Sequence, residues 1–177
     1  MLKQSGRLAH LVSGAMISAW VWVGGSYAAA AREQVAFEGN YRPGTVVVVT
    51  HERQLYLVTA PGEAIRYPVG VGRAGKQWRG TSRIDGKYIR PAWAPPAEVR
   101  RDNPRMPRYI PGGAPNNPMG VAALTLAGDL YAIHGTTQAM RKSVGTFASY
   151  GCIRMLNEDV MDLYRRVSVG TPVVVLP

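Results

Sequence analysis

Short apolar runs separated by turn residues follow residue 44 and set the pattern of the first half of the chain. Residues 45–50 read Thr-Val-Val-Val-Val-Thr, a β-branched run typical of a buried strand. Two more runs, residues 54–59 and 64–71, come after short turns. The pattern predicts a β-meander, with His51 as a solvated turn residue.

A second group of apolar runs closes the chain. Residues 121–126 and 130–134 flank a Gly-Asp turn and predict a β-hairpin. Asn157 is expected to cap a helix, and residues 173–176 form a closing strand. The apolar face of that helix repeats at i, i+3, i+4 and i+7, in Val160, Leu163, Tyr164 and Val167. We predict a mainly β domain, curled or barrel-like around one core, with one marked α-helix after Cys152.

Between these groups, residues 91–118 carry eight prolines and no apolar periodicity. Unbroken loops of this length are uncommon in compact domains and are often lids or binding loops. A solvated, proline-stiffened excursion is the alternative. Four arginines of this segment are candidates for guiding an acidic substrate: Arg100, Arg101, Arg105 and Arg108.

The first 31 residues have the layout of a secretory signal peptide. Lys3 and Arg7 precede an uncharged apolar run at 11–25, and residues 26–31 offer a small-residue cleavage site. The apolar run is short for a membrane span, which needs about 20 residues. We therefore expect export to the periplasm or cell wall without a stable membrane span, with an uncleaved anchor as the alternative. Residues 32–44 are expected to be an irregular amino-terminal arm, and residues 45–177 a single domain.

The chain is strongly basic, with a formal net charge of +10, or +8 once Lys3 and Arg7 leave with the leader. Such a charge suits an anionic surrounding, such as cell-wall polymer or a membrane surface. Nucleic acid is not an expected partner, because the chain is predicted to be exported and shows no recognisable binding motif.

Cys152 is the only cysteine, and His134 ends the predicted strand at 130–134. A thiol beside an imidazole is the minimal arrangement for nucleophilic catalysis, since the imidazole can take the thiol proton and later return it. Gly151, directly before Cys152, allows a sharp turn. A single cysteine in an exported chain has no internal disulfide partner, so we favour a reactive thiol over a small buried apolar residue.

Two other kinds of site find little support. Residues 70–75 match G-x-G-x-x-G, but no helical periodicity follows, so we interpret them as a glycine-rich loop without a dinucleotide. No H-E-x-x-H or C-x-x-C motif is present, and no metal site is predicted.

These features resemble the L,D-transpeptidase (YkuD-type) catalytic domain of bacterial cell-wall enzymes. The family motif has His-Gly at a strand end, a spacer, then Ser/Thr-His-Gly-Cys, an apolar residue, and Arg or Asn. The matching residues are His134-Gly135 and residues 149–154, and the resemblance covers roughly residues 45–177. Tyr150 replaces the family's histidine between serine and glycine, and residues 81–86 also depart from the commoner Thr-Pro-x-Gly.

The resemblance implies a peptidoglycan L,D-transpeptidase that needs no cofactor. Cys152 would form a thioester with the peptide stem, releasing a terminal D-alanine, and a second stem would resolve it. His134 is the implied base and the Gly135 carbonyl its orienting group, while amides of Gly151 and Cys152 are the expected oxyanion donors. Donor and acceptor stems are the implied partners, and carbapenem-type β-lactams the implied inhibitors.

Four residues are candidates for contacting the substrate. Arg154 could hold a stem carboxylate, because a guanidinium matches that shape, or could steady the cysteine loop through a structural pairing. For Tyr131 and Ser149, a strand face and a turn hydrogen bond are equally good explanations. Tyr150 keeps a ring and a hydroxyl but carries no positive charge at neutral pH.

Two alternatives remain open at this point. The thioester could be resolved by water or by a free D-amino acid, which makes the protein an L,D-carboxypeptidase or an exchange enzyme. The chain could also be a non-catalytic wall-binding module, in which Tyr150 marks lost activity and the positive charge supplies adhesion.

Overall fold

The computed structural model describes residues 32–128 and 131–177. Its helices are α1 (Ala97–Asp102), α2 (Asn157–Arg166) and the 3₁₀ turn η1 (Arg141–Ser143). Its strands are β1 (Glu33–Ala36), β2 (Val46–Val49), β3 (Gln54–Ala60), β4 (Glu63–Pro68), β5 (Val71–Gly72), β6 (Gly80–Ile89), β7 (Ala122–Leu126), β8 (Ala132–His134), β9 (Phe147–Ser149), β10 (Ile153–Arg154) and β11 (Pro172–Leu176). The fold is mainly β, as predicted.

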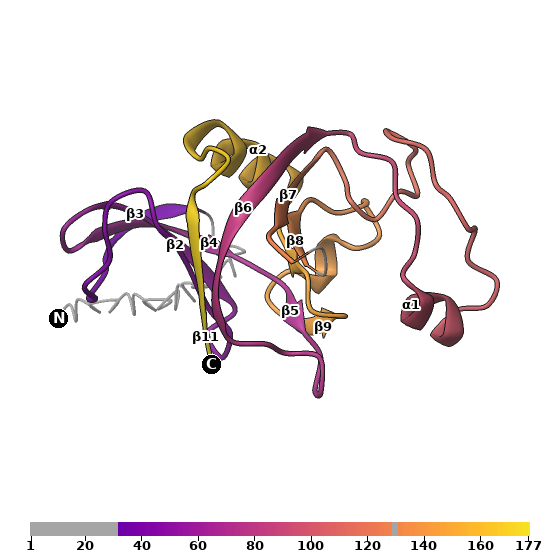
Figure 1. The fold of residues 1–177 in the computed structure, drawn as a ribbon, viewed down its shortest axis with the longest axis horizontal. Coiled ribbons are helices and arrows are strands. Elements are labelled where there is room, and N and C mark those ends of the chain that lie inside the picture. Colours follow the sequence, from indigo (N-terminus) through magenta and orange to yellow (C-terminus); the bar gives the residue numbers. More distant parts are fainter. Residues whose placement is uncertain (1–31, 129–130) are drawn as a thin grey trace, which may run out of the picture.

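Nine strands form one mixed sheet in the order β1-β4-β3-β2-β11-β6-β7-β8-β10, and β5 pairs with β9 beside it. The long strand β6 joins the two halves of this sheet: residues 80–83 pair with β11, and residues 84–89 pair with β7. A register shift between Ile84 and Gly86 marks the change of partner, and such a bulge bends a strand. The sheet therefore curls but stays open (Figure 1). Its strand order ends with β1 on one side and β10 on the other.

The valine run of β2 is buried on both faces because the sheet has a core on each side there. Val46 and Val48 belong to the main core, together with the apolar face of α2. Val47 and Val49 belong to a smaller cluster with Tyr56. A β-branched run without polar alternation is the pattern expected for such a strand, and its neighbour β11 is also valine-rich.

Most of the predicted elements are confirmed, with shifted ends. β2, β3, β11 and the β7–β8 hairpin lie where expected, although residues 129–130 of the hairpin turn are outside the described residues. The third predicted strand ends earlier, at Pro68, and only its last residue, Val71, belongs to β5. The cap of α2 is Leu156 rather than the predicted Asn157, which is the first residue of the helix.

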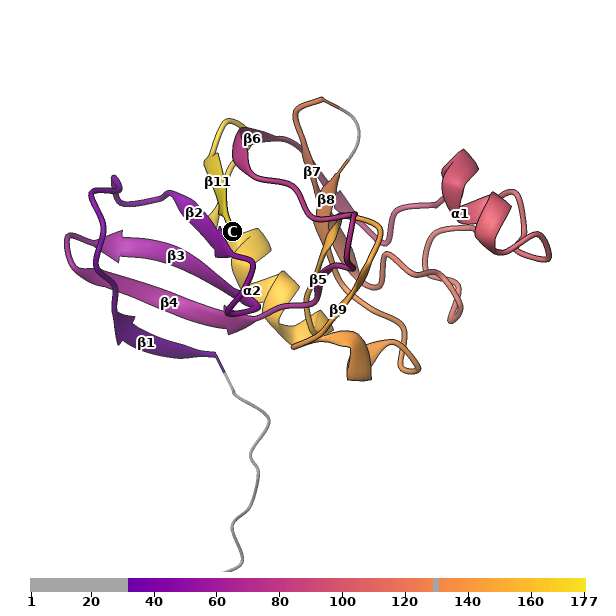
Figure 2. The same ribbon diagram turned by 90° about the horizontal axis from the view of Figure 1, so that it is seen from below.

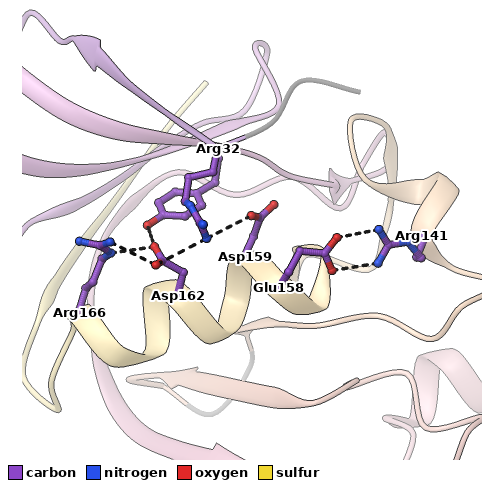
Figure 3. A network of polar contacts seen from close by, with 7 residues as sticks. Arg32, Arg141, Glu158, Asp159, Asp162 and Arg166 are labelled. Carbon is purple, nitrogen blue, oxygen red and sulfur yellow. Dashed lines mark hydrogen bonds and ion pairs between the residues drawn. The ribbon is translucent and has the colours of Figure 1, made fainter. Parts of the chain in front are cut away.

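The amino-terminal segment is only in part the irregular arm that the sequence suggested, because residues 37–44 lie outside helices and strands but residues 33–36 do not. Residues 33–36 form β1, and all four of them pair with residues 63–66 of β4. Arg32, directly before β1, contacts α2. Its guanidinium lies 3.8 Å from Asp159 and 3.5 Å from Asp162 (Figure 3). This segment thus completes one sheet edge and contacts the helix that follows the catalytic loop. The predicted leader, residues 1–31, lies outside the described residues.

Residues 91–118, which we call the lid loop, extend away from the sheet and carry α1 near their middle (Figures 1 and 2). No local pattern in the sequence indicated this short helix. The base of the lid loop is closed by a bridge between Trp93 and Ile110. Asn117, which is 1% exposed, donates to the carbonyls of Pro91 and Pro111 at 2.8 and 3.0 Å. These bonds hold the base of the loop together.

Among the described helices, none is both long and apolar enough to cross a membrane.

Candidate active site

Strands β8 and β10 place the predicted nucleophile and base on one face of the sheet. The two strands pair in parallel, with Ile133 opposite Ile153 and His134 opposite Arg154. Both isoleucines point into the core and are at most 2% exposed. Because side chains alternate along a strand, His134 and Arg154 face the other side, together with Cys152, which directly precedes β10. All three line one cavity.

The turn that carries Cys152 is fixed by Ser149. Its hydroxyl donates to the Cys152 carbonyl at 2.6 Å and accepts from the Gly151 amide at 3.0 Å. Ser149 is 1% exposed. Its hydroxyl is thus engaged within the turn, and of the two explanations considered for this residue the structure favours the turn hydrogen bond.

Gly151 occupies a position that only glycine fits. Its φ is +118°, a backbone conformation that side chains disfavour, and a Cβ there would lie 2.3 Å from the ring of Tyr131. Trp78 stacks on Tyr131 with ring centroids 4.9 Å apart and donates its indole N–H to the Gly151 carbonyl at 3.0 Å. Tyr131 therefore lines the cavity and also braces the catalytic turn, and Trp78 is a bracing residue that the sequence did not reveal.

His134 is held as a neutral imidazole. Its Nδ1 lies 2.7 Å from the carbonyl oxygen of Gly135, which can only accept, so we assign the proton to Nδ1 and the lone pair to Nε2. Burial lowers the pKa of His134 to about 4, and the nearby Arg154 cation adds to this. The carbonyls of Gly135 and Pro118 oppose that shift, because they favour the imidazolium.

Cys152 is also neutral at rest. Burial raises the pKa of its thiol, and a backbone contact with Ala132 and the charge of Arg154 offset this only in part. The two side chains that line this cavity are therefore a neutral thiol and a neutral imidazole rather than a preformed thiolate–imidazolium pair. In such a site the proton moves to the histidine as the sulfur attacks.

Arg154 has no acidic partner among the described residues. Its Nη1 lies 3.4 Å from the hydroxyl of Ser143, and its buried Nε has no hydrogen-bond partner. Burial lowers the pKa of the guanidinium. A structural ion pair is thus not what holds Arg154, and its side chain lines the cavity.

Asn157 holds the backbone next to His134 through hydrogen bonds, a role that the sequence did not indicate. Its Oδ1 accepts from the Thr136 amide at 3.0 Å and from the Val121 amide at 3.4 Å. A Cβ on Gly135 would lie 2.3 Å from the same oxygen, so Gly135 permits this close approach. The expected capping residue instead fixes the backbone that orients His134.

One of the expected oxyanion donors is already occupied. The Gly151 amide donates to Ser149, so it is not free to bind a developing oxyanion. The Cys152 amide donates to none of the residues in 32–128 and 131–177. We therefore keep the Cys152 amide alone as the candidate donor.

The cavity around Cys152 measures about 910 Å³. One side comes from the sheet and the catalytic turn, and the other from the lid loop, including Trp93, Val99 and Met106. The arginines of the lid loop do not line it: Arg100, Arg101, Arg105 and Arg108 are all exposed. The lid loop thus shapes the site with apolar rather than basic side chains.

The other motifs do not build a site in the described part of the chain. Residues 70–75 lead from β5 through a loop into β6, so no helix follows the glycines. No group of three potential metal ligands occurs in residues 32–128 and 131–177. His51 is exposed in its turn and bonds the backbone of Pro177.

The chain is similar in sequence to known proteins over most of its described length. A family model described as the L,D-transpeptidase catalytic domain (YkuD) matches residues 43–175. The probable L,D-transpeptidase YbiS of Escherichia coli K12 is 35% identical over 149 residues, which are 80% of this chain and 47% of YbiS. The chain thus spans about half the length of this relative.

Two solved structures share the fold. One is a Brucella melitensis protein named as a probable carnitine operon oxidoreductase, with 42% identity, a TM-score of 0.55, and 84% of this chain and 94% of that one covered. The other is L,D-transpeptidase 3 of Mycobacterium tuberculosis in complex with a faropenem-derived adduct. It is 17% identical with a TM-score of 0.56 over 75% of this chain and 60% of that one.

Proposed function

The chain belongs to the L,D-transpeptidase (YkuD) catalytic domain family, and we propose that it cross-links peptidoglycan stems through a thioester on Cys152. The observation that carries this proposal is the placement of Cys152, His134 and Arg154 on one face of β8 and β10, lining one cavity. Tyr150 does not stand in for the base, so its replacement of a histidine leaves this pair intact.

In the proposed first step, the sulfur of Cys152 attacks the carbonyl carbon between the third stem residue and the terminal D-alanine. Nε2 of His134 takes the thiol proton as the S–C bond forms, and the resulting imidazolium is stabilised by the carbonyls of Gly135 and Pro118. The carbonyl oxygen becomes an oxyanion, to which the Cys152 amide would donate a hydrogen bond. The C–N bond then breaks, and the imidazolium gives its proton to the departing D-alanine amine.

In the second step, an amine from another stem attacks the thioester. His134 accepts a proton from this amine, and the sulfur leaves and recovers its proton from the imidazolium. One amide bond is broken and one is formed, so the exchange needs no ATP. Arg154 would hold a carboxylate of the donor stem, since its side chain lines the cavity without an acidic partner among the described residues and a guanidinium matches a carboxylate in shape.

The Brucella protein is named as an oxidoreductase, but we do not propose a dinucleotide-dependent reaction for this chain. A dinucleotide fingerprint needs a helix directly after its glycines, and here β6 follows. We also propose that residues 1–31 act as a cleaved leader, which would deliver the domain to the periplasm or cell wall where peptide stems are found.

The mass of the intact protein after exposure to a carbapenem tests the nucleophile. The M. tuberculosis relative carries a β-lactam-derived adduct, which supports the choice of probe. We expect a stable mass increase in the wild type and none in Cys152→Ala. A wild type that remains unmodified, with Cys152 also slow towards iodoacetamide, would contradict the catalytic proposal and favour wall binding.

Products from a purified tetrapeptide stem then separate the possible reactions. Cross-linking gives a dimer with loss of one D-alanine, hydrolysis gives the tripeptide, and added D-methionine gives an exchanged tetrapeptide. We expect the dimer. Tripeptide as the sole product would identify an L,D-carboxypeptidase instead.

A further inference from the structure

Tyr150, the residue that departs from the family motif, points out of the catalytic turn toward the lid loop. Its hydroxyl donates to Oδ2 of Asp102 at 2.8 Å. Asp102 is the last residue of α1 and lies 48 positions earlier in the chain. The residue two positions before the nucleophile is therefore bonded to the far part of the lid loop.

Arg73 completes this contact from a third segment, the loop after β5. Its Nη2 donates to the same Asp102 oxygen at 2.7 Å, and its guanidinium carbon lies 4.2 Å from the centre of the Tyr150 ring. The Arg73 amide donates to the Ser149 carbonyl at 2.9 Å. Arg73 and Tyr150 thus belong to one unit with the catalytic turn, and Asp102 is held by both. We call these three residues the clamp.

A second ion pair joins the same two segments. Lys76 pairs with Glu98, and Glu98 and Asp102 are four residues apart on α1, so they share one face of the helix. The base of the lid loop is fixed by Asn117 and the Trp93–Ile110 bridge. Asp102 and Glu98 supply the hydrogen bonds and ion pairs that join α1 to the catalytic turn and to the loop after β5.

The position of α1 matters because this part of the lid loop forms a wall of the cavity. Val99, Asn103 and Met106 line the cavity together with Cys152 and Tyr150. A shift of α1 would move these side chains relative to Cys152. A ligand that fills the cavity contacts both walls, whereas a small reagent needs only the thiol.

We propose that Tyr150 is a positioning residue which, with Arg73, holds Asp102 and so fixes the α1 wall of the cavity for a bulky acyl donor. The inference rests on the proposed function and extends it, because it assigns the departure from the family motif a role in donor binding rather than in proton transfer. The clamp acts on the affinity for a large donor, not on the reactivity of the thiol.

Tyr150→Phe removes one hydroxyl and keeps the ring beneath Arg73. Measured with meropenem as the bulky donor, this variant should need about two- to fivefold more reagent for half-maximal acylation, the effect of one exposed hydrogen bond to a carboxylate. Its maximal acylation rate, and its alkylation rate with iodoacetamide, should match the wild type. Tyr109→Phe is the control, because Tyr109 is a lid-loop tyrosine, 62% exposed, that makes no side-chain hydrogen bond to the described residues.

The clamp also predicts coupling between its members. Asp102→Ala should raise the half-saturating concentration more than Tyr150→Phe, since it removes the acceptor of both contacts. Tyr150→Phe should then add almost nothing in the Asp102→Ala background. Additive effects, an equal loss with iodoacetamide, or faster acylation by meropenem in Tyr150→Phe would each overturn the proposal.

Hydrogen exchange tests the clamp apart from catalysis. Amides of residues 97–106 should exchange faster in Tyr150→Phe than in the wild type or Tyr109→Phe at second-scale labelling times. Unchanged exchange would reject the clamp, even if the wild type is acylated normally. If the wild type resists meropenem while Tyr150→Phe still loosens this segment, the proposed function fails and the clamp stands.

Discussion

His134 and Arg154 lie directly opposite each other in the parallel register of β8 and β10. A permanent cation is therefore placed beside the candidate base. Its charge lowers the pKa of His134 and favours the thiolate of Cys152. Arg154 thus influences both partners in the proton transfer besides facing the cavity.

Replacing this charge should change the titration of the histidine. We expect Arg154→Gln to raise the pKa of His134 from about 4 toward its ordinary value, while Arg154→Lys, which keeps a cation, leaves it low. An NMR titration of the imidazole signals measures this, with His134→Gln assigning the resonance. An identical titration in Arg154→Gln and Arg154→Lys would show that burial alone sets the pKa.

The same histidine should make stability fall in mild acid. Its pKa is about 4 in the folded chain and 6.5 ordinarily. Between pH 4 and pH 6.5 the unfolded chain binds more protons than the folded chain. The contribution of His134 to the free energy of unfolding is therefore complete above pH 6.5 and is lost as the pH falls toward 4. The shift corresponds to about 3 kcal/mol in the free energy of unfolding.

Urea unfolding at pH 7 and pH 4 tests this contribution. The loss of stability between the two values should be smaller in His134→Gln than in the wild type, because glutamine does not titrate. Equal losses in both proteins would assign the acid sensitivity to carboxylates instead.

A matched pair of glycines separates backbone strain from steric conflict. Gly145 has a φ of +83°, and a Cβ added there would meet no atom within 4 Å, whereas a Cβ on Gly151 would meet Tyr131. Gly145→Ala should cost about 1–2 kcal/mol, the cost of a left-handed non-glycine residue. Gly151→Ala should cost more and abolish carbapenem acylation. Urea unfolding and intact mass measure both effects, and equal behaviour of the two variants would contradict the bracing role of Tyr131.

The buried valine strands were predictable because their pattern is local. β6 was not, because its residues are mostly exposed and it is held by backbone pairing on both sides. β1 is likewise exposed and depends on β4 as its partner. Both strands form because they pair with strands that are distant in sequence. Neither has a hydrophobic alternation from which the strand could be predicted.

The candidate site was also only partly predictable from the sequence. Cys152 and His134 were recognisable from residue types and spacing. Asn157 looked like a helix cap, but its oxygen accepts amides from residues 121 and 136. The contact between Tyr150 and Asp102 joins two segments that only the folded lid loop brings together. Local patterns thus indicated the reacting groups, while their supports depend on tertiary structure.

Asp162 and Glu158 are two carboxylates of α2 drawn in Figure 3. Their side chains are 15% and 54% exposed, so they should differ in their contribution to stability. Asp162 accepts from the hydroxyl of Tyr67, whose side chain is fully buried, at 2.7 Å, and it also pairs with Arg166. Glu158 forms a two-pronged pair with Arg141, but its side chain is 54% exposed.

We expect Asp162→Ala to lower the free energy of unfolding by about 2 kcal/mol, because it leaves a buried hydroxyl without its acceptor. Glu158→Ala should cost less than about 1 kcal/mol, since exposed ion pairs contribute little. Both changes introduce alanine into the same helix, and because aspartate has a lower helix propensity than glutamate, propensity alone would favour Asp162→Ala. Urea unfolding at pH 7 measures the difference. In the Asp162→Ala background, Tyr67→Phe should cost almost nothing further, because the hydroxyl it removes has already lost its partner; a full additional cost would show that the tyrosine hydroxyl stabilises the core in some other way.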